Sequence, residues 1–241
     1  MGVLRGEGLV KRYKGREIVS GVSLEVRSGE IVGLLGPNGA GKTSCFYLLC
    51  GLLFPDGGKI FLQERDITHE PLYRRAQLGI GYLPQEPSVF RQLSVEENLL
   101  AVLELRPGLT ADQRQLFAEE LLQMFELERL ARQKALTLSG GERRRLEIAR
   151  ALALEPHFLL LDEPFAGVDP ISVTEIQQIL ERLRKEAIGI LITDHNVAAT
   201  LSICQRAYLL DRGRLIASGT PEKILKDETV REVYLGETFH L

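Results

Sequence analysis

Residues 31–43 have the sequence IVGLLGPNGAGKT, in which an apolar run leads into a glycine-rich loop that ends in Lys42 and Thr43. The pattern predicts a strand over 31–35 and a helix over 43–51, with the loop between them. Glycines let successive backbone N–H groups face one concave site, and the start of the following helix adds partial positive charge. We therefore expect the loop to bind the phosphates of a nucleotide, through Gly36, Pro37, Asn38, Gly39, Ala40, Gly41, Lys42, Thr43 and Ser44. A glycine turn of purely structural use is the alternative.

Two acids follow a second apolar run. Residues 158–161 are FLLL and precede Asp162 and Glu163. Four apolar residues are typical of a strand buried on both faces, which delivers the acids at its carboxyl end. Asp162 and the hydroxyl of Thr43 are then candidates to support Mg²⁺, and Glu163 to polarise a water near the terminal phosphate. A helix cap made of two acids is the simpler alternative.

A third motif is LSGGE over residues 138–142. Ser139 and Glu142 have the spacing of a capping box, which predicts a helix start. A helix start is also an anion site, and Gly140 and Gly141 leave its amides open to a phosphate.

Composition and charge describe an ordinary folded protein. The chain has 241 residues and a net charge of −3, which provides no cationic field for nucleic acid. Its longest apolar run, over 45–54, is too short for a membrane span of about 20 residues. Charged residues interrupt every apolar stretch near the N-terminus, so no secretory signal is expected there. The three cysteines lack metal or redox spacing and are expected to be reduced thiols in the core.

The order of expected elements indicates an α/β protein. Strands over 59–62, 79–83, 158–161, 188–192, 207–210 and 214–216 alternate with helices over 140–154 and 170–185. Capping-box spacings at Ser94 and Thr110 each predict the start of a helix within residues 86–138. We expect one domain over 1–241, with an α/β core at 1–85 and 139–218, a helical subdomain at 86–138 and a helical tail at 219–241. The basic run at 143–145 is interpreted as a solvated helix face without a chemical role.

The motif series GPNGAGKT, Gln85, LSGGE, FLLLDEP and His195 resembles that of the ABC-type ATPase domains over essentially the whole chain. The resemblance implies a P-loop NTPase core with a RecA-like parallel sheet, an N-terminal antiparallel β region and an inserted helical subdomain. It also implies ATP hydrolysis with Mg²⁺ in a head-to-tail homodimer, each nucleotide lying between residues 36–43 of one copy and Ser139, Gly140, Gly141 and Glu142 of the other.

The same resemblance assigns single residues. Gln85 is similar to the family's glutamine at the metal and water, His195 to its histidine near the terminal phosphate, and Tyr13 to its adenine-stacking aromatic. Asp169 matches an aspartate at the dimer interface, although its context AGVD departs from the commoner SALD. The expected catalytic residues are Lys42, Gln85, Glu163 and His195. Tyr13, Gln85 and His195 could instead have only structural roles.

Within the family, residues 161–173, 192–197 and 233–241 resemble the ATPase subunits of bacterial lipopolysaccharide exporters. This implies a subunit on the cytoplasmic face of the inner membrane, bound to two transmembrane permease subunits and an associated third protein. Residues 88–94 resemble the stretch lining the groove that receives the permeases, so Phe90 and Arg91 are candidate contacts, with Phe90 the anchor. Phe90 could also be a core residue.

Two other functions remain open. One is the ATPase of a branched-chain amino acid importer. The main feature that distinguishes this chain from such an ATPase is the ending after Leu235. The other is a soluble ABC-type clamp acting on ribosomes or DNA. Such clamps carry two ATPase units or a long coiled coil, and neither pattern is present here.

Overall fold

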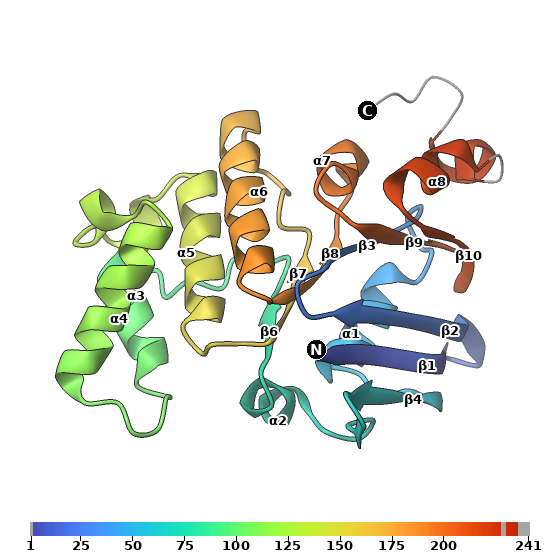
Figure 1. Cartoon of the computed structure of the whole chain (residues 1–241), viewed down its shortest axis with the longest axis horizontal. Coiled ribbons are helices and arrows are strands. Elements are labelled where there is room, and N and C mark those ends of the chain that lie inside the picture. The colour runs from blue at the N-terminus through green and yellow to red at the C-terminus, as the bar shows by residue number, and fades with distance from the viewer. Residues whose placement is uncertain (1, 228–229, 236–241) are drawn as a thin grey trace.

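The computed structural model describes residues 2–227 and 230–235, with two β-sheets and the helices that cover them. The ending expected to discriminate between transporter classes, at 236–241, lies outside these residues. In Figure 1 helices α3–α6 lie on one side of the molecule and the N-terminal strands on the other.

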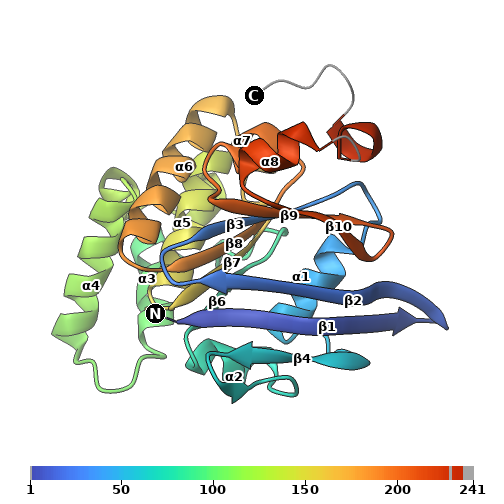
Figure 2. The same cartoon turned by 45° about the vertical axis from the view of Figure 1, so that its right-hand side comes forward.

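The first sheet is antiparallel, with the order β2-β1-β4-β5. Its strands are β1 (Val3–Tyr13), β2 (Arg16–Arg27), β4 (Gly57–Leu62) and β5 (Arg65–Asp66). Lys14 and Gly15 both adopt positive φ between β1 and β2, the geometry of a two-residue hairpin turn. Helix α1 (Lys42–Cys50) contacts β1 and β2 on one side and β7 and β8 on the other, so it lies between the two sheets (Figure 2).

The second sheet has six strands in the order β10-β9-β3-β8-β7-β6. Only β10 (Arg214–Gly219) is antiparallel to its neighbour; the parallel strands are β3 (Ile31–Leu35), β6 (Ile80–Leu83), β7 (Phe158–Asp162), β8 (Gly189–Thr193) and β9 (Arg206–Asp211). The predicted α/β class is confirmed. The carboxyl ends of β3, β6, β7 and β8 meet at one edge, where the motifs follow.

Alternate side chains of the central strands enter two cores. Leu159 and Leu161 of β7 pack with the helices α3–α6, whereas Leu160 packs with α1 and the antiparallel sheet. A third, smaller cluster joins Leu35 and Leu209 to the C-terminal helices. The apolar run before Asp162 is thus buried on both faces, as a central parallel strand requires.

The interval 86–138 holds α3 (Val95–Leu103), α4 (Ala111–Met124) and the short turns η1 (Glu128–Leu130) and η2 (Ala135–Thr137). The remaining helices are α2 (Leu72–Gln77), α5 (Gly140–Leu152), α6 (Pro170–Lys185), α7 (Val197–Leu201), α8 (Pro221–Lys226) and the π-helix η3 (Arg231–Leu235). The capping boxes predicted at Ser94, Thr110 and Ser139 are all present, and Asp169 caps α6 with Pro170 in its first turn.

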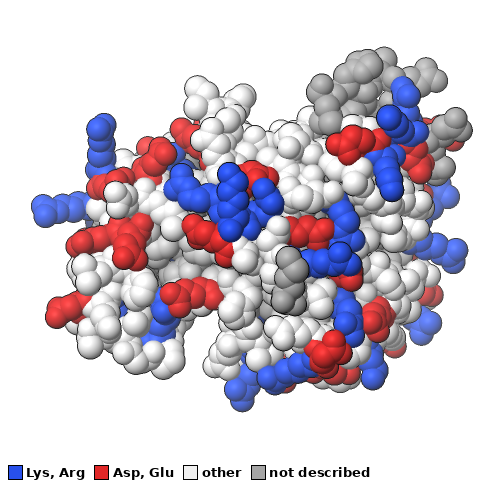
Figure 3. All heavy atoms as spheres, viewed as in Figure 1, with Lys and Arg blue, Asp and Glu red and all other residues white. Residues whose placement is uncertain are grey.

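The three cysteines are free and buried, as predicted. Burial raises the pKa of Cys45 to about 12 and also raises the pKa values of Cys50 and Cys204. No helix among the described residues is long and apolar enough to cross a membrane. Figure 3 shows acidic and basic side chains interspersed over one face, in keeping with the small net charge.

Candidate functional site

The glycine-rich loop leaves β3 at Gly36 and enters α1 at Lys42. Gly36 has a φ of 148°, and a Cβ there would lie 2.1 Å from the carbonyl oxygen of Leu210. Gly41 has a φ of 99°, and a Cβ there would lie 2.6 Å from the carbonyl oxygen of Ile18. Neighbouring backbone therefore excludes any side chain at these two positions, which keeps the loop narrow at both ends.

Lys42 lies inside the loop. Its Nζ donates to the carbonyl oxygens of Gly36 (2.7 Å) and Pro37 (3.0 Å), and the side chain is buried. Burial lowers the pKa of Lys42, while the nearby carboxylates of Glu163 and Asp162 act in the opposite direction. The ammonium is thus placed where a bound phosphate could accept a hydrogen bond from it.

Asp162 ends β7 and is buried. Its pKa is raised to about 6, mainly by burial and then by Glu163. Its Oδ2 has no hydrogen-bond partner within the described part of the chain. An orphaned buried carboxylate oxygen beside a phosphate loop fits a hard cation such as Mg²⁺, which prefers oxygen ligands. Among residues 2–227 and 230–235 no group of three His, Cys, Asp or Glu side chains is placed to hold a metal ion.

Glu163 is held in a conformation that few residues adopt. Its φ is 49°, in the left-handed region, and its N–H donates to the carbonyl of Thr193 (2.7 Å). Strained backbone of this kind persists only where the surroundings enforce it. The result is that the carboxylate projects from the edge of the sheet toward the loops after β6 and β8.

Three predicted catalytic residues meet at this carboxylate. Gln85 Nε2 donates to Glu163 Oε2 (2.8 Å), and His195 Nε2 lies 2.7 Å from Oε1. Gln85 follows β6, Glu163 follows β7 and His195 follows β8, so neighbouring strands bring together residues far apart in sequence. The arrangement can position a water and accept its proton.

The prediction of a solvated basic face at 143–145 is wrong for Arg144. Arg144 is 5% exposed and donates to the carbonyl oxygens of Pro84, Asp162, Glu163 and Pro164 at 2.7–3.1 Å. Its Nη1 also donates to Glu147 Oε2 (2.9 Å). The sequence obscured this because three arginines in a row resemble a charged surface. Arg144 nevertheless shares a helical face with Gly141 and Ile148, both of which are buried.

The segment Ser139–Glu142 contacts the start of α6. A Cβ on Gly140 would lie 3.0 Å from the carbonyl oxygen of Gly167, and one on Gly141 would lie 2.2 Å from Ser172 Oγ. Asp169 accepts from the N–H groups of Ile171 and Ser172, and these bonds lower its pKa. No hydrogen bond between described residues joins this segment to the phosphate loop of the same chain.

Tyr13 ends β1 and is 64% exposed, with the Lys14 ammonium 5.5 Å above its ring. The hairpin lies near the phosphate loop, because Ile18 of β2 approaches Gly41. The Tyr13 ring is therefore accessible for stacking at one side of the loop.

Phe90 and Arg91 lie in the loop between β6 and α3. Phe90 is 47% exposed, so it is not a core residue, and the Arg150 guanidinium carbon lies 4.4 Å from its ring centroid. The buried Asn98 fixes the loop: its Oδ1 accepts from the N–H of Phe90 (2.8 Å), and its Nδ2 donates to the carbonyls of Phe90 (3.0 Å) and Ser94 (2.9 Å). Sequence patterning alone did not single out Asn98.

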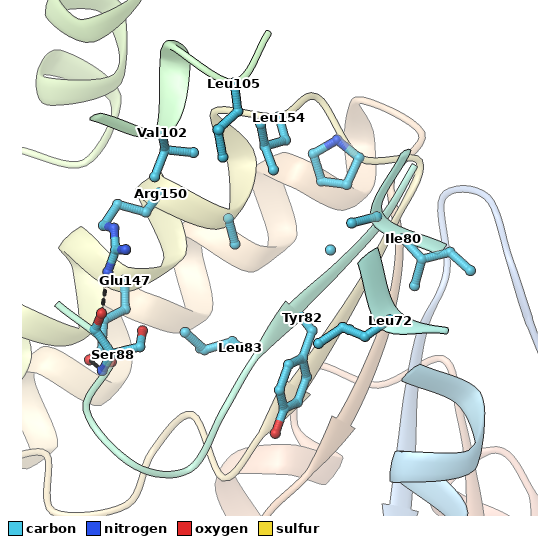
Figure 4. A pocket seen from close by; sticks show the side chains of 14 residues that line it. Leu72, Ile80, Tyr82, Leu83, Ser88, Val102, Leu105, Glu147, Arg150 and Leu154 are labelled. Carbon is cyan, nitrogen blue, oxygen red and sulfur yellow. Dashed lines mark hydrogen bonds between the residues drawn. The ribbon is translucent and has the colours of Figure 1, made fainter. Parts of the chain in front are cut away.

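An apolar cavity of about 260 Å³ opens close to this loop. Figure 4 shows side chains from α2, β6, α3 and α5 around it, among them Leu72, Tyr82, Val102 and Arg150. Arg150 donates to the carbonyl of Ser88 (2.6 Å), and Glu147 accepts from the N–H of Ser88 (2.8 Å). One helix, α5, thus contacts both this cavity and the backbone of Asp162 and Glu163.

Two family profiles match the sequence. The profile described as ABC transporter matches residues 19–166, and one described as branched-chain amino acid ATP-binding cassette transporter matches 214–240. The lipopolysaccharide export system ATP-binding protein LptB of Escherichia coli is 58% identical over 241 residues, which cover 100% of both chains. The C-terminal residues alone therefore do not separate the two transporter classes. The identity to LptB, in contrast, extends over the whole chain and includes every motif.

Solved structures of ATP-binding cassettes have the same fold as this chain. The ADP conformation of an ATP-binding cassette of an ABC transporter superimposes with a TM-score of 0.85 and 30% identity, covering 98% of this chain and 100% of that one. A dimeric post-hydrolysis cassette bound to ADP and Pi has a TM-score of 0.80 and 26% identity, covering 90% and 98%. The chain belongs to the ABC transporter ATP-binding family, as an ATP hydrolase of the LptB branch.

Proposed function

We propose that the protein is the ATPase of a lipopolysaccharide export system, which powers extraction of the lipid from the inner membrane for transport to the outer membrane. The observation that carries this is the 58% identity to LptB from end to end, with no part of either chain left over. In this role it lies peripherally on the cytoplasmic face of the inner membrane.

The site residues have the following roles in our proposal. Glu163 accepts the proton of the attacking water, which Gln85 and His195 orient through the bonds described above. Lys42 and the loop amides neutralise the charge of the phosphates, and Tyr13 stacks on adenine. Asp162, Thr43 and Gln85 would hold Mg²⁺, which when bound would supply further charge neutralisation at the phosphates.

A second copy completes each site. Ser139, Gly140, Gly141 and Glu142 form a helix start with open amides, which suits a phosphate, yet its contacts within the chain are with residues 167–172. We infer that it faces the nucleotide of the other copy, with Asp169 at the interface. The dimeric ADP-bound relative supports this arrangement.

The transmembrane partners dock at the cavity beside Phe90. We expect the permeases LptF and LptG, which LptC accompanies, each to place a short helix there. Apolar side chains line the cavity, and its lining residue Arg150 lies against the exposed Phe90 ring, with Arg91 next in the chain. Arg150, Glu147 and Arg144, on successive turns of α5, connect the Phe90 loop to the carbonyls of Asp162 and Glu163. Docking can therefore bias the position of Glu163 through one rigid helix.

The alternative is the ATPase of a branched-chain amino acid importer, which the match over 214–240 favours. Purification of the chain from its native cell envelope, with identification of the co-purifying membrane proteins, separates the two. Lipopolysaccharide permeases support the proposal, and amino acid permeases without them contradict it. A soluble clamp would bring no membrane protein.

The docking site has its own test in the same preparation. Phe90→Ala should weaken complex assembly and leave ATP hydrolysis by the purified chain unchanged. Leu116→Ala, which alters an exposed leucine on α4, is the matched control. Normal assembly of the Phe90 variant would show that the partners bind elsewhere.

A further inference from the structure

A buried carboxylate that the proposed mechanism does not use lies directly before His195. Asp194 is 3% exposed and follows Thr193, the last residue of β8. Strands β7 and β8 pair in parallel with Asp162 opposite Thr193, and Figure 2 shows them next to each other. Glu163 and Asp194 therefore leave the same edge of the sheet as neighbours.

Each oxygen of the Asp194 carboxylate accepts a hydrogen bond from a different segment. Oδ1 accepts from the N–H of Asn196 (2.7 Å), two residues further on, which closes a turn around His195. Oδ2 accepts from the N–H of Phe165 (2.8 Å), in the segment that follows Glu163. One buried side chain therefore joins the turn that carries His195 to the segment that carries Glu163.

This connection decides where the imidazole lies relative to Glu163. His195 Nε2 is 2.7 Å from Glu163 Oε1, yet the His195 side chain is 55% exposed, so packing alone does not hold it. The backbone of Glu163 is fixed separately, because its N–H donates to the carbonyl of Thr193 (2.7 Å). A shift of the turn at Asp194 would therefore move His195 away from a carboxylate that stays in place.

We propose that Asp194 is a positioning residue for ATP hydrolysis, which holds the His195 turn against the segment after β7 and thereby places the imidazole at the Glu163 carboxylate. This rests on the proposed roles of Glu163 and His195 and adds to them the group that sets their relative position. Asp194 acts through His195, since both of its oxygens face backbone N–H groups.

The test is Asp194→Asn in the full-length chain, measured as phosphate release. The amide side chain has only one acceptor oxygen, so the N–H of Phe165 or of Asn196 loses its partner and should exchange its hydrogen faster. Misplacement of His195 should lower kcat about ten- to a hundredfold. KM for ATP should change little, because the contacts of the phosphate loop over 36–44 do not involve Asp194.

A cycle with His195→Ala separates positioning from a general structural effect. If Asp194 acts through His195, Asp194→Asn should slow the His195→Ala variant by less than about twofold. An equal fractional loss in the wild-type and His195→Ala backgrounds would overturn the inference. A wild-type kcat for Asp194→Asn would overturn it as well.

Thr68→Val is the matched control. Thr68 is also buried, and its Oγ1 accepts from the backbone N–H of Ile60 (2.9 Å) in the antiparallel region. Both variants take a side-chain acceptor from a backbone N–H, but only Asp194→Asn should lower kcat. An equal fall of kcat in Thr68→Val would contradict the assigned role.

A second variant covers the case in which Asp194→Asn does not bind ATP. Asp194→Ser keeps an oxygen that can close the turn at Asn196 but is too short to reach Phe165, and it should show the same fall of kcat. Loss of ATP binding in both variants would show that Asp194 only supports the fold, and the inference would be wrong.

Failure of the proposed function is detected separately. If Glu163→Gln and His195→Ala both hydrolyse ATP at the wild-type rate, the assigned catalytic site is wrong, whatever Asp194→Asn does. If both of these variants are slow and Asp194→Asn is not, only the role of Asp194 is refuted.

Discussion

Replacing Glu147 by leucine should destabilise the protein far more than a typical change of one acid. Glu147 is 3% exposed, and its two oxygens accept from Arg144 Nη1 (2.9 Å) and from the N–H of Ser88 (2.8 Å). Removal leaves a buried guanidinium without its counter-charge and a backbone N–H without its acceptor. Breaking a buried pair in this way costs about 3–5 kcal/mol of the free energy of unfolding.

Urea unfolding of the wild type, Glu147→Leu and Arg144→Met, with the double variant, measures this cost. The double variant should be more stable than the sum of the single changes predicts, with a coupling free energy of about 1–3 kcal/mol. Glu155→Leu is the control, because its ion pair with Arg106 (2.6 Å) is exposed and should contribute less than about 1 kcal/mol.

The same variants connect stability to activity. Arg144 holds the carbonyls of Asp162 and Glu163, so Arg144→Met should also lower the rate of ATP hydrolysis under conditions where the variant is folded. The reasoning would be refuted if Glu147→Leu unfolded at the same urea midpoint as the wild type. It would also be refuted if the free-energy losses of the two single variants simply added in the double variant.

Three further predictions concern the site itself. Glu163→Gln should lower turnover about 10²–10⁴-fold and retain nucleotide, as measured by phosphate release and ATP binding; wild-type turnover would contradict it. Because burial raises the pKa of Asp162 to about 6 from an ordinary 3.8, folding favours its protonated form. The wild type should therefore gain stability relative to Asp162→Asn as pH falls from 7 to 4, by up to about 3 kcal/mol; parallel pH profiles in urea unfolding would exclude this. Ser139→Ala and Thr110→Ala each remove a capping box worth about 1 kcal/mol, but only Ser139→Ala should abolish ATP-dependent dimerisation and hydrolysis. Equal activity of the two would argue against a shared site.

Local sequence predicted the elements that carry the motifs. The strand over 31–35, the helix over 170–185 and three capping boxes are as predicted, because each depends on a pattern within a few residues. The strand-loop-helix context of residues 31–51 likewise requires no distant contact. The alternation of such units was sufficient for the α/β class.

Contacts between segments that are distant in the sequence could not be predicted from local patterns. The role of Arg144 depends on carbonyls contributed by the ends of β6 and β7, which the sequence places 18 to 60 residues away. The packing of Tyr234 on the cluster around Leu35 likewise depends on how η3 lies against the end of β3. Neither contact has a periodicity or spacing of its own, so tertiary structure was needed to find it.

The burial of all three thiols has a practical consequence for labelling experiments on the dimer. A thiol that is enclosed and holds its proton reacts slowly with maleimides, so the wild-type background needs no cysteine replacement before site-directed labelling. A single cysteine introduced at the exposed Leu116 or Ile171 would be the preferred target for a spin label or fluorophore. Distances between two labelled copies could then report the approach of the subunits during the ATP cycle.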